Sequence, residues 1–78
     1  MPLRVYDRRL LRETLVEVLR SANEALTFNE IAERLAERLP APPSRYNLRC
    51  VLASLVAECI VERIPLYERA KMGFRLKR

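Results

Sequence analysis

The chain is 78 residues long, which is the size of one domain with a small hydrophobic core. Half of its residues are hydrophobic, which favours a folded protein over a disordered one, yet no apolar run approaches the ~20 residues that a membrane-spanning helix requires. The formal net charge is +5, and residues 60–78 hold six Lys or Arg against two Glu. Such a basic surface favours an anionic partner such as nucleic acid. Because the charged N-terminus lacks the apolar run of a secretory signal, we expect a single cytoplasmic domain over residues 1–78.

What the sequence lacks argues against an enzyme. There is no histidine, which is the commonest general base and a frequent zinc ligand, and a single glycine cannot form a Gly-rich phosphate loop. The acidic residues are scattered along helix faces beside arginines, a pattern typical of surface ion pairs. We therefore expect no enzymatic activity, no metal and no cofactor. Abundant Arg and Glu, with no Gln or His, are typical of a thermophilic source.

A first helix is predicted from Asp7, a favourable N-cap, to about Arg20. Its apolar stripe consists of Leu11, Leu15, Val18 and Leu19. Leu10 and Val16 fall outside that stripe. One interpretation is that these two residues form the contact of a symmetric homodimer through this helix. The other is that they pack under the N-terminal segment 1–6.

The middle of the chain carries a specific helix-start signal. Ala25 and Leu26 are predicted to form a short extended piece. The sequence Thr-Phe-Asn-Glu follows, a capping box in which the Thr27 hydroxyl and the Glu30 carboxylate cap the helix start reciprocally. The apolar face of this second helix consists of Ile31, Leu35 and Leu39, with Phe28 beside it. Pro40 ends the helix, and Pro-Ala-Pro-Pro forms a stiff connection to the next element.

A third helix is predicted from Ser44, whose hydroxyl can cap its first turn, to near Cys59. Its apolar face consists of Leu48, Val51, Leu52, Leu55, Val56 and Cys59. Cys50 lies nine residues before Cys59, about 13 Å along the helix axis, which is too far for a disulfide. We therefore interpret Cys59 as a small hydrophobic residue on the apolar face.

Strand alternation replaces helical periodicity after the third helix. One side of the first strand holds Ile60, Glu62, Ile64 and Leu66, and the other side holds Val61 and Arg63. Gly73 closes a connection, and residues 74–77 alternate again. Pro65 indicates that this first strand lies at the edge of a sheet.

The order helix, short strand, helix, turn, helix, strand, loop, strand resembles a winged helix-turn-helix domain. The stretch Thr-Phe-Asn-Glu-Ile-Ala-Glu-Arg-Leu is similar to the second helix of that family, and Tyr46–Arg63 is similar to its third helix and the start of its wing. The resemblance covers Asp7–Leu76 and implies an α+β fold with three helices and a small antiparallel sheet. Two features depart from the family: Cys59 stands where glycine is common, and the link between the second and third helices is longer and rich in proline.

In this family the third helix usually enters the major groove of DNA, and the wing touches the backbone or the minor groove. The resemblance thus implies a small transcriptional regulator whose partner is double-stranded DNA. Arginine can read guanine, asparagine can read adenine, and a tyrosine hydroxyl can hold a phosphate. The nucleic-acid-binding residues that we predict are Arg45, Tyr46, Asn47 and Arg49 on the third helix, and Arg69 and Lys71 at the tip of a wing that spans Leu66–Gly73.

Other interpretations of the same residues stay open. The charges of the last two strands can be ordinary edge-strand charges that prevent aggregation. The outward residues of the third helix after Arg49 are small, namely Cys50, Ala53, Ser54 and Ala57, and small residues also allow close approach to another protein. The alternatives are therefore a protein-interaction winged helix within a larger complex, or a domain that binds structured RNA by its shape.

Overall fold

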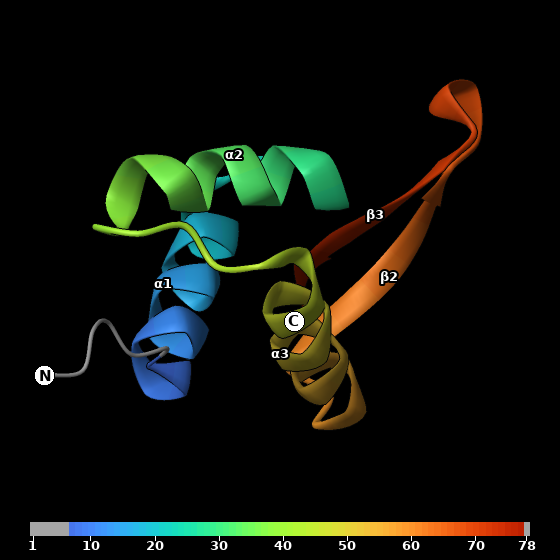
Figure 1. Cartoon of the computed structure of the whole chain (residues 1–78). Helices are drawn as coiled ribbons and strands as arrows, with labels where there is room; N and C mark the ends of the chain where they lie inside the picture. The colour runs from blue at the N-terminus through green and yellow to red at the C-terminus, as the bar shows by residue number, and fades with distance from the viewer. Residues whose placement is uncertain (1–6, 78) are drawn as a thin grey trace, which may run out of the picture.

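The computed structural model describes residues 7–77, which form an α+β fold of three helices and a three-stranded antiparallel sheet. In chain order the elements are α1 (Arg8–Ser21), β1 (Leu26–Thr27), α2 (Phe28–Arg38), α3 (Arg45–Ala57), β2 (Val61–Leu66), a 3₁₀ turn (Tyr67–Arg69) and β3 (Lys71–Leu76). Strands β2 and β3 form a hairpin that extends away from the helices (Figure 1). The predicted combination of three helices with a small antiparallel sheet is confirmed.

All three predicted helix caps are present. The carboxylate of Asp7 and the hydroxyl of Ser44 each accept a hydrogen bond at 3.0 Å from the backbone N–H three residues later. At the start of α2, the Thr27 hydroxyl accepts from the backbone N–H of Glu30 at 3.2 Å, and the Glu30 carboxylate accepts from the backbone N–H of Thr27 at 2.9 Å. Because this capping box satisfies two N–H groups that the chain would otherwise leave free, it fixes the start of α2 directly after β1.

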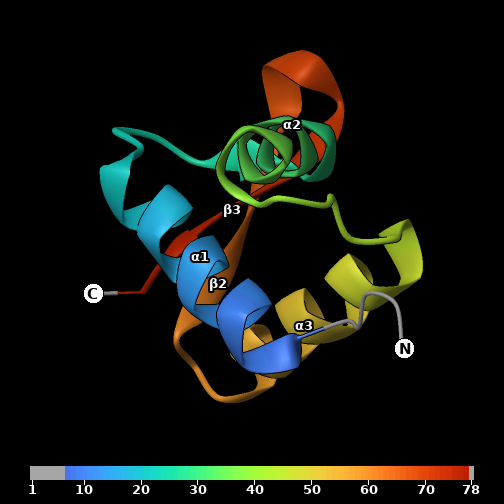
Figure 2. The ribbon, with the colours of Figure 1, turned by 60° about the vertical axis from the view of Figure 1, so that its left-hand side comes forward.

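The hydrophobic core lies where the three helices meet each other and the sheet (Figure 2). Its buried apolar residues are Leu11, Leu15, Val18, Leu19, Leu26, Ile31, Leu35, Leu48, Val51, Leu52, Leu55 and Val61. The apolar stripes predicted for the helices supply most of this core, since helical spacing places them on one side of each helix. None of the described helices is both long enough and apolar enough to cross a membrane.

The two apolar residues off the main stripe of α1 differ in exposure. Leu10 is 42% exposed, whereas Val16 is half-buried and packs against the core. Val16 therefore packs within the fold, while Leu10 lies at the surface. Packing against the segment 1–6 lies outside the described residues, and a homodimer through α1 stays a prediction.

The basic residues at the start of α1 contact the end of α3. Arg8 Nη2 donates to Ser54 Oγ at 3.0 Å. Arg12 binds both carboxylate oxygens of Glu58, at 3.1 Å from Nη1 and 2.5 Å from Nη2. These contacts give a reason for cations at a helix N-terminus, where the helix dipole itself disfavours them.

The sheet has the order β1–β3–β2, so β3 is hydrogen-bonded on both sides. The short strand β1 covers residues 26–27, one residue later than the predicted piece Ala25–Leu26. Gly73 lies in β3 where the strands approach closely. A Cβ atom at this position would lie 2.9 Å from both Ala25 Cβ and Leu66 Cδ1, so a larger residue would require these neighbouring side chains to shift.

The end of α3 corrects the interpretation of Cys59. The helix ends at Ala57, and Cys59 is exposed with a left-handed backbone, φ 65°. The backbone N–H of Ile60 donates to Leu55 O and that of Cys59 donates to Val56 O, each at 3.0 Å. This is a Schellman motif, which usually carries glycine at the left-handed position. Cys59 thus takes a conformation that usually favours glycine, and it is not part of the apolar face.

Candidate functional site

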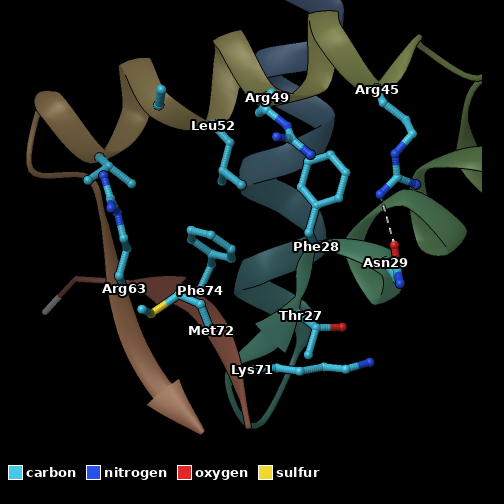
Figure 3. Close-up of a pocket in the computed structure, with 12 residues that line it drawn as sticks. Thr27, Phe28, Asn29, Arg45, Arg49, Leu52, Arg63, Lys71, Met72 and Phe74 are labelled. Carbon is cyan, nitrogen blue, oxygen red and sulfur yellow. Dashed lines mark hydrogen bonds between the residues drawn. The ribbon is translucent and has the colours of Figure 1, made fainter.

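A hollow of about 570 Å³ opens between α3, the β2–β3 hairpin and the start of α2 (Figure 3). Its apolar lining consists of Phe28, Leu52, Ala53, Val56, Met72 and Phe74. Four cations also line it, namely Arg45, Arg49, Arg63 and Lys71, together with Thr27 and Asn29. Among the described residues, the lining includes no acidic side chain. The hollow therefore combines an apolar floor with uncompensated positive charge.

Helical and strand periodicities explain why these side chains meet. Arg45, Arg49 and Val56 lie on one stripe of α3, because residues spaced by three, four and seven share a face. This stripe borders the buried one and faces the hairpin. Arg63 of β2 lies directly opposite Phe74 of β3, so both side chains are on the same face of the sheet. In Figure 3 the ring of Phe74 points into the hollow between Arg63 and Phe28.

Phe28, the first residue of α2, positions two of the four cations. The guanidinium carbon of Arg45 lies 4.9 Å from the centroid of its ring, and that of Arg49 lies 5.2 Å from it. Arg45 Nη2 also donates to Asn29 Oδ1 at 3.3 Å. Cations at such distances over an aromatic face are attracted by its quadrupole, and exposed examples contribute ~0.5–1 kcal/mol. Both guanidinium groups are thus held against one ring, and neither has an acidic partner among residues 7–77.

Four arginines of residues 7–77 take part in ion pairs. The pairs in the described residues are Arg12–Glu58, Arg20–Glu17, Arg69–Glu30 and Arg75–Glu62. Within residues 7–77, none of the four cations of the hollow takes part in an ion pair. Hydrogen bonds lower the pKa of two of these acids, Glu58 and Glu30. A hydrogen bond from Arg12 lowers the pKa of Glu58, and the Thr27 N–H, followed by Arg69, lowers the pKa of Glu30.

Three of the six residues predicted from the sequence meet at the hollow: Arg45, Arg49 and Lys71. Tyr46 is 75% exposed on the outward face of α3, where the neighbouring Cys50 side chain raises the pKa of its hydroxyl.

The other two predicted residues lie elsewhere. Asn47 is half-buried and lines a separate groove between the start of α1 and the proline-rich link. Arg69 turns from the hairpin tip toward α2, where its Nη2 lies 3.0 Å from Glu30 Oε2. Of the four small residues predicted to face outward on α3, Ala53 and Ala57 are exposed, whereas Cys50 and Ser54 are half-buried.

Sequence reasoning did not select Phe28, Arg63, Met72 or Phe74 for the site. Phe28 was interpreted as a residue beside the apolar face of α2, and it does pack partly against the core. Arg63 and Phe74 could be brought together only with the cross-strand register, which the 3₁₀ turn of the hairpin determines. The sequence analysis places Met72 in the connection before Gly73, whereas the structure has it in β3, where alternation puts it on the same face as Phe74.

No group of three or more His, Cys, Asp or Glu side chains that could hold a metal ion occurs in residues 7–77. A scan against models of known protein families finds no match to this chain, and a search of curated proteins finds no relative.

Proposed function

We propose that this protein is a winged helix-turn-helix domain that binds double-stranded DNA as a small transcriptional regulator. The order α1–β1–α2–α3–β2–β3, with β3 between the other two strands, supports this assignment. The observation that carries the proposal is the group of four cations around the hollow, which has no acidic partner in the described residues. Phosphates of a nucleic acid would supply the missing negative charge.

The third helix would enter the major groove, which admits an α-helix. The outward face of α3 has a small-residue strip at Ala53 and Ala57, both exposed, so the helix can approach base edges closely. Arg49 lies between this outward face and the hollow, which suits a contact with a base edge. The hairpin would then follow the sugar-phosphate backbone beside the groove, with Lys71 and Arg63 near phosphates.

The proposed contacts differ from those predicted from the sequence at three residues. Arg69 already binds Glu30, so its role is to hold the hairpin tip against α2. Asn47 faces the proline-rich link and is left out of the contact set. Arg63 is added, because it lines the hollow beside Phe74.

The test is fluorescence anisotropy with a labelled random-sequence duplex across a salt series, beside the same duplex made of RNA. Wild-type protein should bind DNA at micromolar concentration, and binding should weaken steeply as salt rises. Lys71→Ala should weaken all sequences alike and lower the salt slope by about 1, whereas Arg49→Ala should also change the preferred sequences in a selection experiment. Arg20→Ala is the control, because that arginine is paired with Glu17 on α1.

The outcome that overturns the proposal is an absence of DNA binding at low salt. A protein-interaction module would then be the better candidate, because the apolar floor of the hollow also suits an acidic peptide with apolar side chains. Binding to duplex RNA with no DNA binding would instead favour the structured-RNA alternative.

A further inference from the structure

The apolar floor of the hollow is larger than contact with a DNA backbone requires. An intact duplex presents charged oxygens and sugars along its backbone, while the flat faces of its bases are stacked inside. Met72 is 44% exposed, and the ring of Phe74 points into the open space (Figure 3). An intact duplex that lay against the cations would leave this floor without an apolar partner.

The two aromatic rings of the hollow differ in what covers them. Phe28 already has the guanidinium groups of Arg45 and Arg49 over its ring. Phe74 has no such cation–π partner in the described residues and is only partly buried against the core. Its ring is therefore the aromatic surface that remains for a ligand, with the polarizable side chain of Met72 beside it.

A ligand that satisfies this hollow needs a flat apolar part and negative charge on either side of it. An unpaired nucleotide within a nucleic acid strand has both, because a base has two apolar faces and the chain continues into phosphates. The volume of about 570 Å³ is within the range of about 300–1,000 Å³ that is typical of small-molecule sites.

Resting on the proposed DNA binding, we infer that the hollow receives an unpaired base, so that the protein prefers DNA with an interrupted duplex. The base stacks on Phe74, and the flanking phosphates lie near Arg63 on one side and Lys71 on the other. The outward face of α3 contacts the paired segment next to it. The protein then recognises the unpaired position in the duplex by stacking, which tolerates any base, and the cations supply affinity.

The experiment compares three labelled probes of one sequence by anisotropy: an intact duplex, the same duplex with a central bulge of two thymidines, and the same bulge made of two abasic sites. Wild-type protein should bind the thymidine bulge about tenfold more tightly than the other two probes, since stacking of one base contributes an effect of this size. The abasic bulge has the same flexibility without bases, so it separates stacking from easier bending.

Phe74→Leu should bring the affinity for the thymidine bulge close to that for the intact duplex, because leucine keeps the apolar packing and removes the aromatic face. Met72→Ala, at an exposed position, should lower the preference about twofold to threefold without any threat to the fold. Tyr67→Leu is the matched control, since it removes an aromatic ring from the same hairpin that is 86% exposed and does not line the hollow. This control should keep the full preference.

Two results overturn the inference while leaving the proposed function intact. One is salt-dependent binding of the intact duplex with equal affinity for all three probes. The other is a bulge preference that Phe74→Leu and Met72→Ala leave unchanged. If none of the probes binds at low salt, the proposed function itself fails, and this inference fails with it.

Discussion

The four cations of the hollow and the four arginines that form ion pairs have different surroundings. Arg12, Arg20, Arg69 and Arg75 each lie within 3.0 Å of a carboxylate oxygen. The four cations of the hollow have no such partner in the described residues, and two of them stack on one phenylalanine instead. Both groups belong to the same basic chain, so overall composition does not explain the difference.

The paired cations join elements of the molecule, whereas the four cations of the hollow are the ones that we propose bind an anionic partner. Exposed ion pairs contribute only ~0–1 kcal/mol each, so their main effect here is to fix positions. The Arg12–Glu58 pair attaches α1 to the end of α3, and the Arg69–Glu30 pair attaches the hairpin tip to α2. Together they hold the elements that form the hollow. Gathering like charges there without counter-charges disfavours the free protein, and an anionic ligand removes that cost.

The largest effect on DNA binding is expected when an acidic residue is placed inside the hollow. Ala53 lines it and is exposed, so Ala53→Glu adds a carboxylate among the four cations without disturbing the core. Like-charge contact with phosphate costs several kcal/mol, and we expect DNA affinity in the anisotropy assay to fall by about 100-fold or more.

Ala36→Glu is the charge-matched control for this substitution. Ala36 is exposed on α2 and does not line the hollow, so its replacement changes the net charge by the same amount at another place. Its affinity should fall by less than about threefold, through long-range effects that salt screens. Equal losses in the two variants would mean that net charge, and not the hollow, determines binding.

The parts of this molecule that sequence reasoning predicted well depend on local spacing. The caps at Asp7, Thr27 and Ser44 follow from short side chains placed three residues before a free N–H, which is a purely local geometry. The core stripes follow in the same way from a repeat of three and four. These features needed no knowledge of which elements touch.

The parts that were missed depend on how distant segments meet. The pairing of Arg63 with Phe74 depends on the hairpin register, and a shift by one residue would reverse the face of each side chain. Arg69 appeared free in the sequence because its partner, Glu30, lies 39 residues away. Cys59 was assigned to the apolar face because a helix boundary two residues too late rotates it inward.

A smaller effect is expected where an acid is removed from the paired group. Glu30→Ala deletes the reciprocal capping bond to Thr27 and the ion pair with Arg69. We expect the free energy of unfolding at pH 7, measured with urea, to fall by about 1–2 kcal/mol. Glu17→Ala also removes one acid of an exposed pair, but no cap, so its effect should stay within about 0.5 kcal/mol.

The effect of Glu30→Ala should also depend on pH. The pKa of Glu30 in the folded protein lies below its ordinary value of 4.5, chiefly because its carboxylate accepts from the Thr27 N–H. A carboxylate of this kind contributes stability above pH 4.5, and that contribution is lost as the pH falls through the lowered pKa. The difference between wild type and Glu30→Ala should therefore be largest near neutral pH and shrink below pH 4.5. A constant difference across this range would contradict the role given to the ionised group.

The smallest expected effect lies at the end of α3, away from the hollow. Cys59 adopts a left-handed backbone that costs a side-chain-bearing residue ~1–2 kcal/mol, and glycine avoids this cost while losing more entropy on folding. Cys59→Gly should therefore raise the free energy of unfolding by about 0.5–1 kcal/mol. Cys50→Gly, in the interior of the same helix, should lower it by about 1 kcal/mol, because glycine disfavours helix there. Opposite signs at two cysteines would show that backbone conformation decides the outcome, and DNA titrations of Cys59→Gly should superimpose on those of wild type, since this turn does not line the hollow.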